Sequence, residues 1–176
     1  MSSVLNLDQF KNSPVDPSYP EWIRTFYSPL DDVHEVLKAL IDNTKQSLII
    51  SMFGYDDDEL AQIVASKIDN PNIYCQITLD KSQSGGVHEK ALLEKYKAEM
   101  SSNSVAVGTS EKGAIIHRKM VVIDGLWRIS GSTNWSLSGE TKQDNELTVI
   151  NNATVAAEAR HAMDLAHLKV RRQMNK

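Results

Sequence analysis

Apolar residues along the chain follow two spacings, which predict alternating strands and helices. The segment 47–53 is largely apolar, as in a strand that is buried on both faces of a sheet. In residues 31–44 the apolar side chains recur every three or four positions, which predicts a helix with one buried face. By the same criteria, further strands are expected at 22–28, 72–79, 104–108, 117–123, 126–130 and 146–151, and further helices at 56–68, 87–100 and 154–170.

The order of these elements predicts an α/β domain. Strands that alternate with helices favour a layered fold with a mostly parallel sheet. Asp124-Gly125 lies between two predicted strands, and Asp-Gly is typical of a tight hairpin turn, so the sheet should be mixed. Residues 1–20 contain three prolines and little periodicity, which indicates an N-terminal arm before a single domain at 21–176.

The composition indicates a soluble protein. The chain has 176 residues, of which 41% are hydrophobic and 24% charged, as is ordinary for a globular domain. No apolar run is long enough to cross a bilayer, and the N-terminus lacks the pattern of a secretory signal. The single cysteine, Cys75, has no partner for an internal disulfide, which also excludes a cysteine-rich zinc site. We therefore expect a cytoplasmic protein without stable membrane insertion.

Charge is distributed unevenly along the chain. The net charge of −4 argues against a strongly basic nucleic-acid scaffold. Residues 21–80 carry four basic and eleven acidic residues, whereas 81–128 carry eight and five, and 160–176 carry five and one. Positive charge therefore gathers in the second half of the chain, either as solvated surface or as attraction for an anionic substrate.

The strongest chemical signal is a histidine and a lysine two residues apart in a predicted strand. His117 and Lys119 should project from the same face, with Arg118 on the other face. A neighbouring ammonium group favours the neutral imidazole, which is the nucleophilic form. Such a pair suits a phosphate ester, because lysine can hold a phosphoryl oxygen while histidine attacks phosphorus.

A second polar group follows the returning strand. Ser132 and Asn134 lie in Gly-Ser-Thr-Asn, which the hairpin should bring back beside His117, and both are expected to donate hydrogen bonds to phosphoryl oxygens. Glu146 opens the next strand and is expected to accept a hydrogen bond from the second ring nitrogen of His117. Asp124 is a secondary candidate that should serve mainly the hairpin turn.

Together these motifs resemble the signature of the phospholipase D superfamily. The signature is His-x-Lys-x4-Asp (His117, Lys119, Asp124), then Gly-Ser-x-Asn-Trp-Ser at 131–136 and Asn145-Glu146. With one motif copy, the chain is similar to the Nuc-type bacterial endonucleases and, more distantly, to the Zucchini-type cardiolipin hydrolases. The resemblance spans roughly 22–172 and implies an α/β/α sandwich, a phosphodiesterase that needs no metal or other cofactor, and an active site shared by two copies of the motif.

A single motif predicts a two-fold homodimer. In-line displacement at phosphorus needs an attacking group on one side and a proton donor on the other. His117 cannot occupy both places, so we expect one subunit to supply His117 as nucleophile and the other to supply it as general acid and then base. Lys119 and Asn134 of both subunits would hold one phosphate. His88-Glu89-Lys90 repeats the His-x-Lys spacing alone and is expected to be helix surface.

The expected substrate is DNA, or RNA, cleaved without sequence specificity, because contacts to phosphate carry no sequence information. Phospholipid hydrolysis, with cardiolipin among the targets, and a non-catalytic nucleic-acid-binding role are the alternatives. The acidic segment 56–59 is either the first turn of a helix or a barrier that narrows substrate choice. Candidates for steering a polyanion are Lys81, Lys112, Arg118 and Arg128, and residues expected to pack or lie on the surface are His34, Trp135, His161 and His167.

Overall fold

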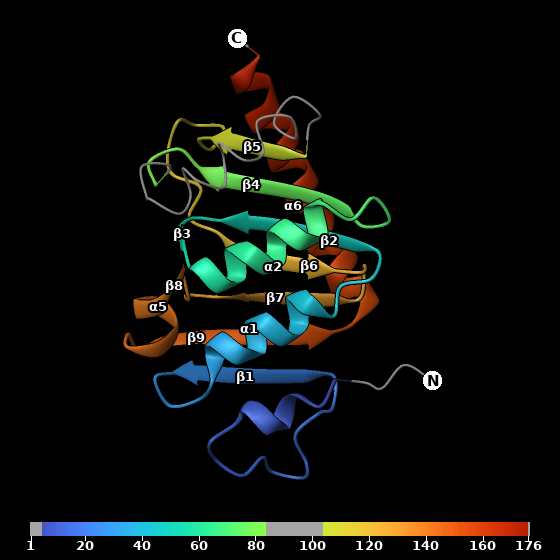
Figure 1. The fold of residues 1–176 in the computed structure, drawn as a ribbon, viewed down its shortest axis with the longest axis vertical. Helices are drawn as coiled ribbons and strands as arrows, with labels where there is room; N and C mark the ends of the chain where they lie inside the picture. Colours follow the sequence, from blue (N-terminus) through green and yellow to red (C-terminus); the bar gives the residue numbers. More distant parts are fainter. Residues whose placement is uncertain (1–4, 84–103, 176) are drawn as a thin grey trace.

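A seven-stranded sheet forms the centre of the computed structural model, which describes residues 5–83 and 104–175 (Figure 1). The strand order is β1-β9-β7-β6-β2-β4-β5. All seven strands lie where the apolar pattern predicts them, whereas the helix expected at 87–100 falls outside the described residues. The bounds of the seven strands are β1 Ile23–Ser28, β2 Ser47–Met52, β4 Tyr74–Asp80, β5 Val105–Gly108, β6 Lys119–Ile123, β7 Trp127–Gly131 and β9 Asn145–Asn151.

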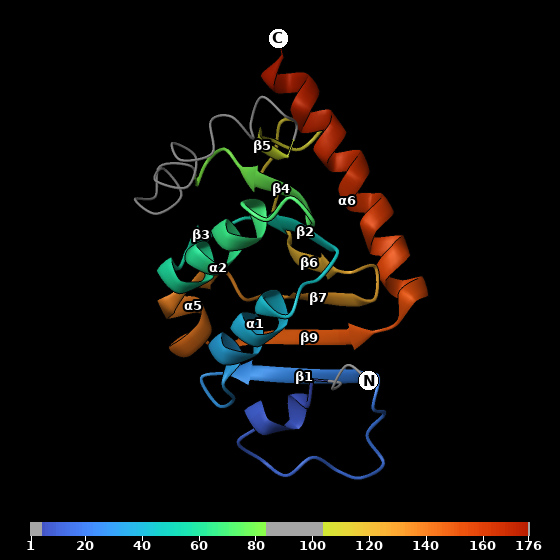
Figure 2. The same cartoon turned by 45° about the vertical axis from the view of Figure 1, so that its right-hand side comes forward.

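Helices cover both faces of the sheet, as expected of an α/β/α sandwich (Figure 2). Helices α1 (Val33–Asp42) and α2 (Asp58–Ile68) bury their apolar stripes against one face, in the largest hydrophobic cluster. The long helix α6 (Ala153–Met174) covers the other face, where Ala156 and Met163 pack against β2 and β6. Among the described helices, none is both long and apolar enough to cross a bilayer.

The sheet is mixed, as the Asp-Gly turn suggested, but the expectation that it is mostly parallel is wrong. Among the described strands, only β2–β4 and β4–β5 pair in parallel. The other four pairings are antiparallel, because β6 runs back beside β2 and the β6–β7 hairpin continues into β9 and β1. The hairpin turn is as predicted: Asp124 and Gly125 both have positive φ, and Leu126 donates to the carbonyl of Ile123 at 3.0 Å.

Four small elements were not predicted from the sequence. A 3-10 helix, η1 (Leu7–Phe10), lies near the N-terminus. A second sheet joins β3 (Tyr55–Asp56) to β8 (Trp135–Ser136), and α5 (Leu137–Thr141) follows β8 directly. The strands of this second sheet are two residues each, which is too short for an alternating pattern to be recognised.

A buried ion pair attaches the N-terminal segment to the rest of the chain. Lys11 Nζ lies 2.6 Å from Asp31 Oδ2, and the Asp31 side chain is fully buried. The Asp31 carboxylate also accepts the backbone N–H groups of Asn12 and Tyr27. Burial alone would raise the pKa of Asp31, but the hydrogen bonds from Lys11 and from these two N–H groups outweigh it and lower the pKa.

We predict that Lys11→Met destabilises the fold at neutral pH by about 3 kcal/mol, because it leaves a buried carboxylate without its cation. The folded-state pKa of Asp31 lies below its unfolded value. Its contribution is therefore present at neutral pH and is lost as pH falls through the folded pKa. Urea unfolding should show a large difference between variant and wild type at about pH 7 and a smaller one near pH 3. Lys67→Met is the control, because Lys67 pairs with the exposed Asp42. Equal losses in the two variants would contradict the prediction.

Candidate active site

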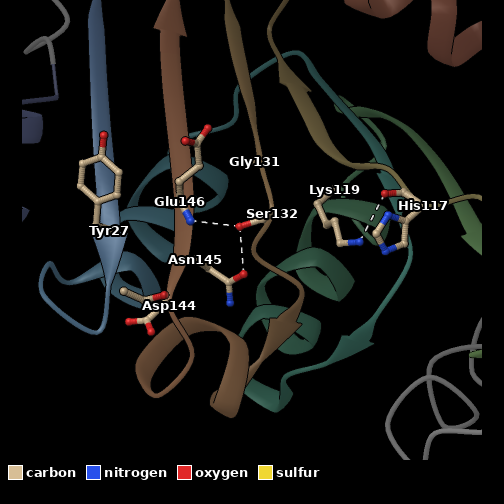
Figure 3. A pocket seen from close by; sticks show the side chains of 9 residues that line it. Tyr27, His117, Lys119, Gly131, Ser132, Asp144, Asn145 and Glu146 are labelled. Atoms are coloured by element: carbon tan, nitrogen blue, oxygen red, sulfur yellow. Dashed lines mark hydrogen bonds between the residues drawn. The ribbon is translucent and has the colours of Figure 1, made fainter.

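A pocket of about 700 Å³ opens at one edge of the sheet (Figure 3). The carboxyl ends of β1 and β7 meet the amino ends of β6 and β9 at this edge, as the register of the strands requires. Loops at strand ends are free of sheet pairing, so their polar groups are available to a ligand. The pocket is lined by Tyr27, Ser28, His117, Lys119, Gly131, Ser132, Asp144, Asn145 and Glu146.

His117 and Lys119 lie together at this pocket, and both contact the ring of Phe53. His117 precedes the first residue of β6 and is exposed, and its ring meets Phe53 edge-on at a centroid distance of 4.9 Å. Lys119 Nζ lies 4.8 Å from the centroid of the same ring and donates to the carbonyl of His117 at 3.3 Å. Phe53 is held in turn by its own N–H, which donates to the carbonyl of Arg118. The aromatic ring therefore fixes both groups by cation–π and edge contacts.

The ammonium group of Lys119 is the most constrained charge of the pocket. Lys119 is only 7% exposed, and burial lowers its pKa. No carboxylate among the described residues forms an ion pair with it. A buried cation without an anion is a favourable place for a phosphate group, which would supply the missing negative charge.

Ser132 lines the pocket, but in this structure its hydroxyl is already hydrogen-bonded. Ser132 Oγ donates to Asn145 Oδ1 at 2.9 Å and accepts the backbone N–H of Glu146 at 3.1 Å (Figure 3). Asn145 Nδ2 donates to the carbonyl of Gly139 at 3.0 Å. This network holds the loop after β7 against the start of β9, so Ser132 would have to exchange its partner to donate to a substrate.

Asn134 lies at the same sheet edge, although it does not line the pocket. Its side chain packs against Gly54, where a Cβ would come within 3.0 Å of Asn134 Cγ. Gly54 comes two residues after Met52, which pairs with Lys119 in the sheet, so Asn134 lies close to Lys119. Asn134 Oδ1 is buried and has no hydrogen-bond partner among the described residues. The half-buried amide of Asn134 therefore lies near the candidate active site, and its oxygen is still able to accept a hydrogen bond.

The expected hydrogen bond between His117 and Glu146 is not formed in this structure. Strand β7 lies between β9 and β6, which separates the two backbones by roughly 10 Å. The neighbouring side chain, Leu147, is buried in the core beneath α1, so by strand alternation Glu146 projects to the opposite face. Its carboxylate points away from His117 in Figure 3. The side chain of Asn145, not that of Glu146, takes part in the hydrogen bonds around Ser132, to which Glu146 contributes only its backbone.

The structure does not bring Asp124 to the pocket. Asp124 follows the last residue of β6, whereas His117 precedes the first, which separates them by roughly 20 Å along the strand. Its carboxylate accepts the backbone N–H groups of Lys45 at 3.0 Å, Gln46 at 2.7 Å and Ser47 at 2.9 Å. Asp124 thus holds the entry into β2 while forming the hairpin turn, which is a structural role at the far edge of the sheet.

The predicted steering residues are dispersed. Arg118 is exposed and lines a second cavity of about 420 Å³ together with His117. Lys81 is exposed just after β4, outside the residues that line the candidate pocket. Lys112 is exposed in a turn, and Arg128 is half-buried within β7. Of these four side chains, only Arg118 adjoins His117.

Other sequence-based expectations can also be placed. Trp135 is a packing residue, as expected: it is 1% exposed and lies against Tyr55. His161 is exposed, and His167 is buried with Nδ1 2.9 Å from Thr78 Oγ1. Of the acidic segment 56–59, Asp58 and Glu59 form the first turn of α2 as expected and Asp57 caps it by accepting the N–H of Leu60, whereas Asp56 lies in β3. His34 instead contacts Glu140 and Asp57 between the helices. His88 and Lys90 lie outside the described residues.

Phe53 was not predicted from the sequence, Asn145 was named only as part of the signature, and Tyr27, Ser28 and Asp144 also line the pocket. Phe53 ends an apolar run, and nothing in a single sequence distinguishes a core phenylalanine from one that leaves the core at the strand end. For Asn145 a signal was present, because it alternates with the apolar Leu147 and Val149 in the predicted strand. The alternation places the side chain of Asn145 on the same face of the sheet as Leu147 and Val149, and that of Glu146 on the opposite face.

Comparison with known proteins identifies relatives of this fold. Residues 37–165 match a domain family described as "Cardiolipin synthase, PLD-like domain". The curated relatives include a phospholipase D of Rickettsia bellii, 24% identical over 76% of this chain and 63% of its own length. Another is a mitochondrial cardiolipin hydrolase of Chlamydomonas reinhardtii, 22% identical over 70% of this chain and 52% of its own length. The chain thus spans between half and two thirds of the length of these relatives.

Two solved structures share the fold. One is Nuc of Salmonella typhimurium, a phospholipase D family member, with a TM-score of 0.70 and 19% identity over 84% of this chain and 94% of that chain. The other is NucT of Helicobacter pylori, with a TM-score of 0.65 and 16% identity over 84% of this chain and 96% of that chain.

For Asp124 we predict a loss of stability without a loss of chemistry. Asp124→Ala removes the acceptor of three N–H groups and places an alanine at φ 53°, so the free energy of unfolding should fall by about 2–3 kcal/mol. Asp124→Asn retains an acceptor and tolerates positive φ, so it should lose less than half as much. Urea unfolding and phosphodiester hydrolysis per folded molecule are the two measurements. A folded, stable Asp124→Asn with strongly reduced turnover would show instead that the carboxylate takes part in the reaction.

Proposed function

Because this chain belongs to the family of phospholipase D-like domains, which are phosphodiester hydrolases, we propose that it is a non-specific endonuclease that acts on DNA, or RNA, without a metal ion. One observation carries the proposal: an exposed imidazole shares one pocket and one supporting ring with a buried ammonium group that has no ion-pair partner among the described residues. The first is a nucleophile, and the second is a binding site for a phosphoryl oxygen.

The proposed reaction has two displacement steps. A nitrogen of His117 attacks phosphorus, the bond from phosphorus to the leaving oxygen breaks, and that oxygen takes a proton from a second imidazolium. Water then gives a proton to the second imidazole and attacks phosphorus, and the bond between phosphorus and His117 breaks. Lys119 holds a non-bridging oxygen in both steps and stabilises the charge that develops on it.

The second imidazole would come from another copy of the chain. Among the residues that line the pocket, His117 is the only histidine. Glu146 projects from the opposite face of the sheet and is poorly placed to protonate a leaving group opposite His117. A two-fold homodimer that brings two pockets together would place His117 of the partner subunit on the far side of the phosphate.

Nucleic acid is the substrate that the polar pocket favours. Lys119 offers a hydrogen-bond donor to a sugar–phosphate backbone, and Ser132 could offer a second by exchanging its bond to Asn145. No base-reading groove is required for cleavage without sequence specificity. The similarity to Nuc and NucT agrees with this choice. Asp144 also lines the pocket and would repel a second phosphate, so we expect the site to bind a thin, single backbone.

Phospholipid hydrolysis is the second candidate, and the cavity on the other side of His117 favours it. Ile115 and Leu165 line this cavity and are about half exposed, with Arg118 beside them and Lys169 ion-paired with Glu111. An apolar wall with cations suits the glycerol and acyl part of an anionic lipid. The curated relatives named phospholipase D and cardiolipin hydrolase agree with this alternative.

The proposal is tested by offering plasmid, single-stranded DNA, RNA and cardiolipin liposomes to the purified chain in EDTA. We expect EDTA-resistant cleavage of nucleic acid, reduced by about a thousandfold or more in His117→Ala, because the nucleophile is lost. His161→Ala is the matched control, since His161 is exposed on α6, and it should retain full activity. Turnover of lipid alone would establish the phospholipase instead. Binding of nucleic acid without any turnover would leave a non-catalytic role.

A further inference from the structure

Three side chains of kinds that bind metal ions converge between α1, α2 and α5, outside the candidate active site. His34 lies in the first turn of α1, Asp57 caps the start of α2, and Glu140 lies in α5. His34 Nδ1 is 2.5 Å from Glu140 Oε2 and 3.4 Å from Asp57 Oδ2. One ligand atom from each residue lies within 4.8 Å of the others. Segments far apart in the sequence thus present a nitrogen and two oxygens to one point.

The charges of this cluster do not balance. Asp57 is 6% exposed and Glu140 only 1% exposed, so two buried carboxylates face a single imidazole. Lys38, which also lies on α1, is 2.7 Å from Glu35 and 2.6 Å from Glu59, both at the surface. Glu59 is 3.4 Å from the other ring nitrogen of His34 and adds further negative charge. A cation bound among these groups would offset the cost of burying the carboxylates.

One buried oxygen also lacks a partner. Glu140 Oε1 is fully enclosed and has no hydrogen bond among the described residues, whereas Oε2 contacts His34. Burial raises the pKa of Glu140 to about 7, and the nearby Asp57 carboxylate adds to this effect. The backbone N–H of Ser136 also lies near this carboxylate, but no donor bonds Oε1 with good geometry among the described residues. Such a buried oxygen is uncommon in native proteins, and a metal ion is one of the partners that satisfy it.

We propose that His34, Asp57 and Glu140 bind one divalent transition-metal ion. Imidazole nitrogen with carboxylate oxygen is a ligand set for zinc and its neighbours, rather than for Mg²⁺ or Ca²⁺, which prefer oxygen alone. Zinc lies about 2.0–2.2 Å from such ligands, which places tetrahedral ligands roughly 3.4 Å apart. The separation of His34 and Asp57 already has this value. The distance between His34 Nδ1 and Glu140 Oε2 would have to increase by roughly 1 Å, because the metal would take the place of the proton that these atoms share.

The ion would have a structural role. Asp57 Oδ1 accepts the N–H of Leu60 and is thereby oriented, which leaves Oδ2 for the metal. Glu140 follows Gly139, whose carbonyl accepts the amide of Asn145 in the active-site pocket. A bound ion would therefore join α1 and α2 to the segment that carries Asn134 and supports the pocket. It contacts none of the residues that line the pocket, so the chemistry proposed above does not depend on it.

The test is zinc binding by the full chain after treatment with EDTA and dialysis. We expect isothermal titration with Zn²⁺ to give about one ion per chain, and the melting temperature to rise by roughly 5 °C at saturation. His34→Gln and Glu140→Gln should each weaken binding by at least about tenfold, while Mg²⁺ has no effect. His117→Ala and His161→Ala are controls that should bind zinc as the wild type does.

The outcomes separate a metal site from a buried ion pair. No zinc binding by the wild type, or equal binding by the His34 and Glu140 variants, would overturn the proposal and leave a hydrogen-bonded ion pair. Loss of binding in His117→Ala would place the ion at the active site instead. A second test uses the wild type alone. Added Co²⁺ should give the visible absorption of a four-coordinate site, and the absence of this absorption would count against the site. None of these readouts uses phosphodiester hydrolysis, so they are independent of the proposed function.

Discussion

In-line displacement at phosphorus requires an attacking group and a proton donor on opposite sides of the phosphate, and this constraint governs how the site can work. The fold sets one imidazole and one ammonium group at the edge where β6 begins. Their backbones are fixed by the pairing of Met52 with Lys119, and their side chains by the ring of Phe53. In the proposed mechanism, the pocket of one chain would therefore supply half of the required groups, all on one side of the phosphate.

The sheet edge also explains why the polar groups remain available. Within the sheet, backbone donors and acceptors are used by neighbouring strands, and α1, α2 and α6 bury both faces. At the edge these constraints end, so His117 is exposed while Lys119, two residues later, is already buried. Burial of the ammonium group costs free energy that a bound phosphate would offset. The group that destabilises the free site would thus contribute to binding of the proposed substrate.

Local patterns predicted the strands, most helices and the Asp124-Gly125 turn, because each depends on neighbouring residues alone. The order of strands could not be predicted, since it depends on contacts between distant segments. That order places β7 between His117 and Glu146 and makes most pairings antiparallel. The pairing of His117 with Lys119 followed from strand spacing, whereas the role of Phe53 depends on how β2 ends. Likewise, Asp124 was assigned to the motif by spacing, but its partners, Lys45–Ser47, belong to another strand's entry.

The central claim is that two copies of the chain complete one active site. Its most direct test is the activity of a mixed dimer, isolated by two affinity tags, that contains one wild-type subunit and one His117→Ala subunit. If each site needs both imidazoles, this dimer should have less than about 1% of the wild-type activity on nucleic acid. If each subunit acts alone, it should retain about half, and that result would contradict the account.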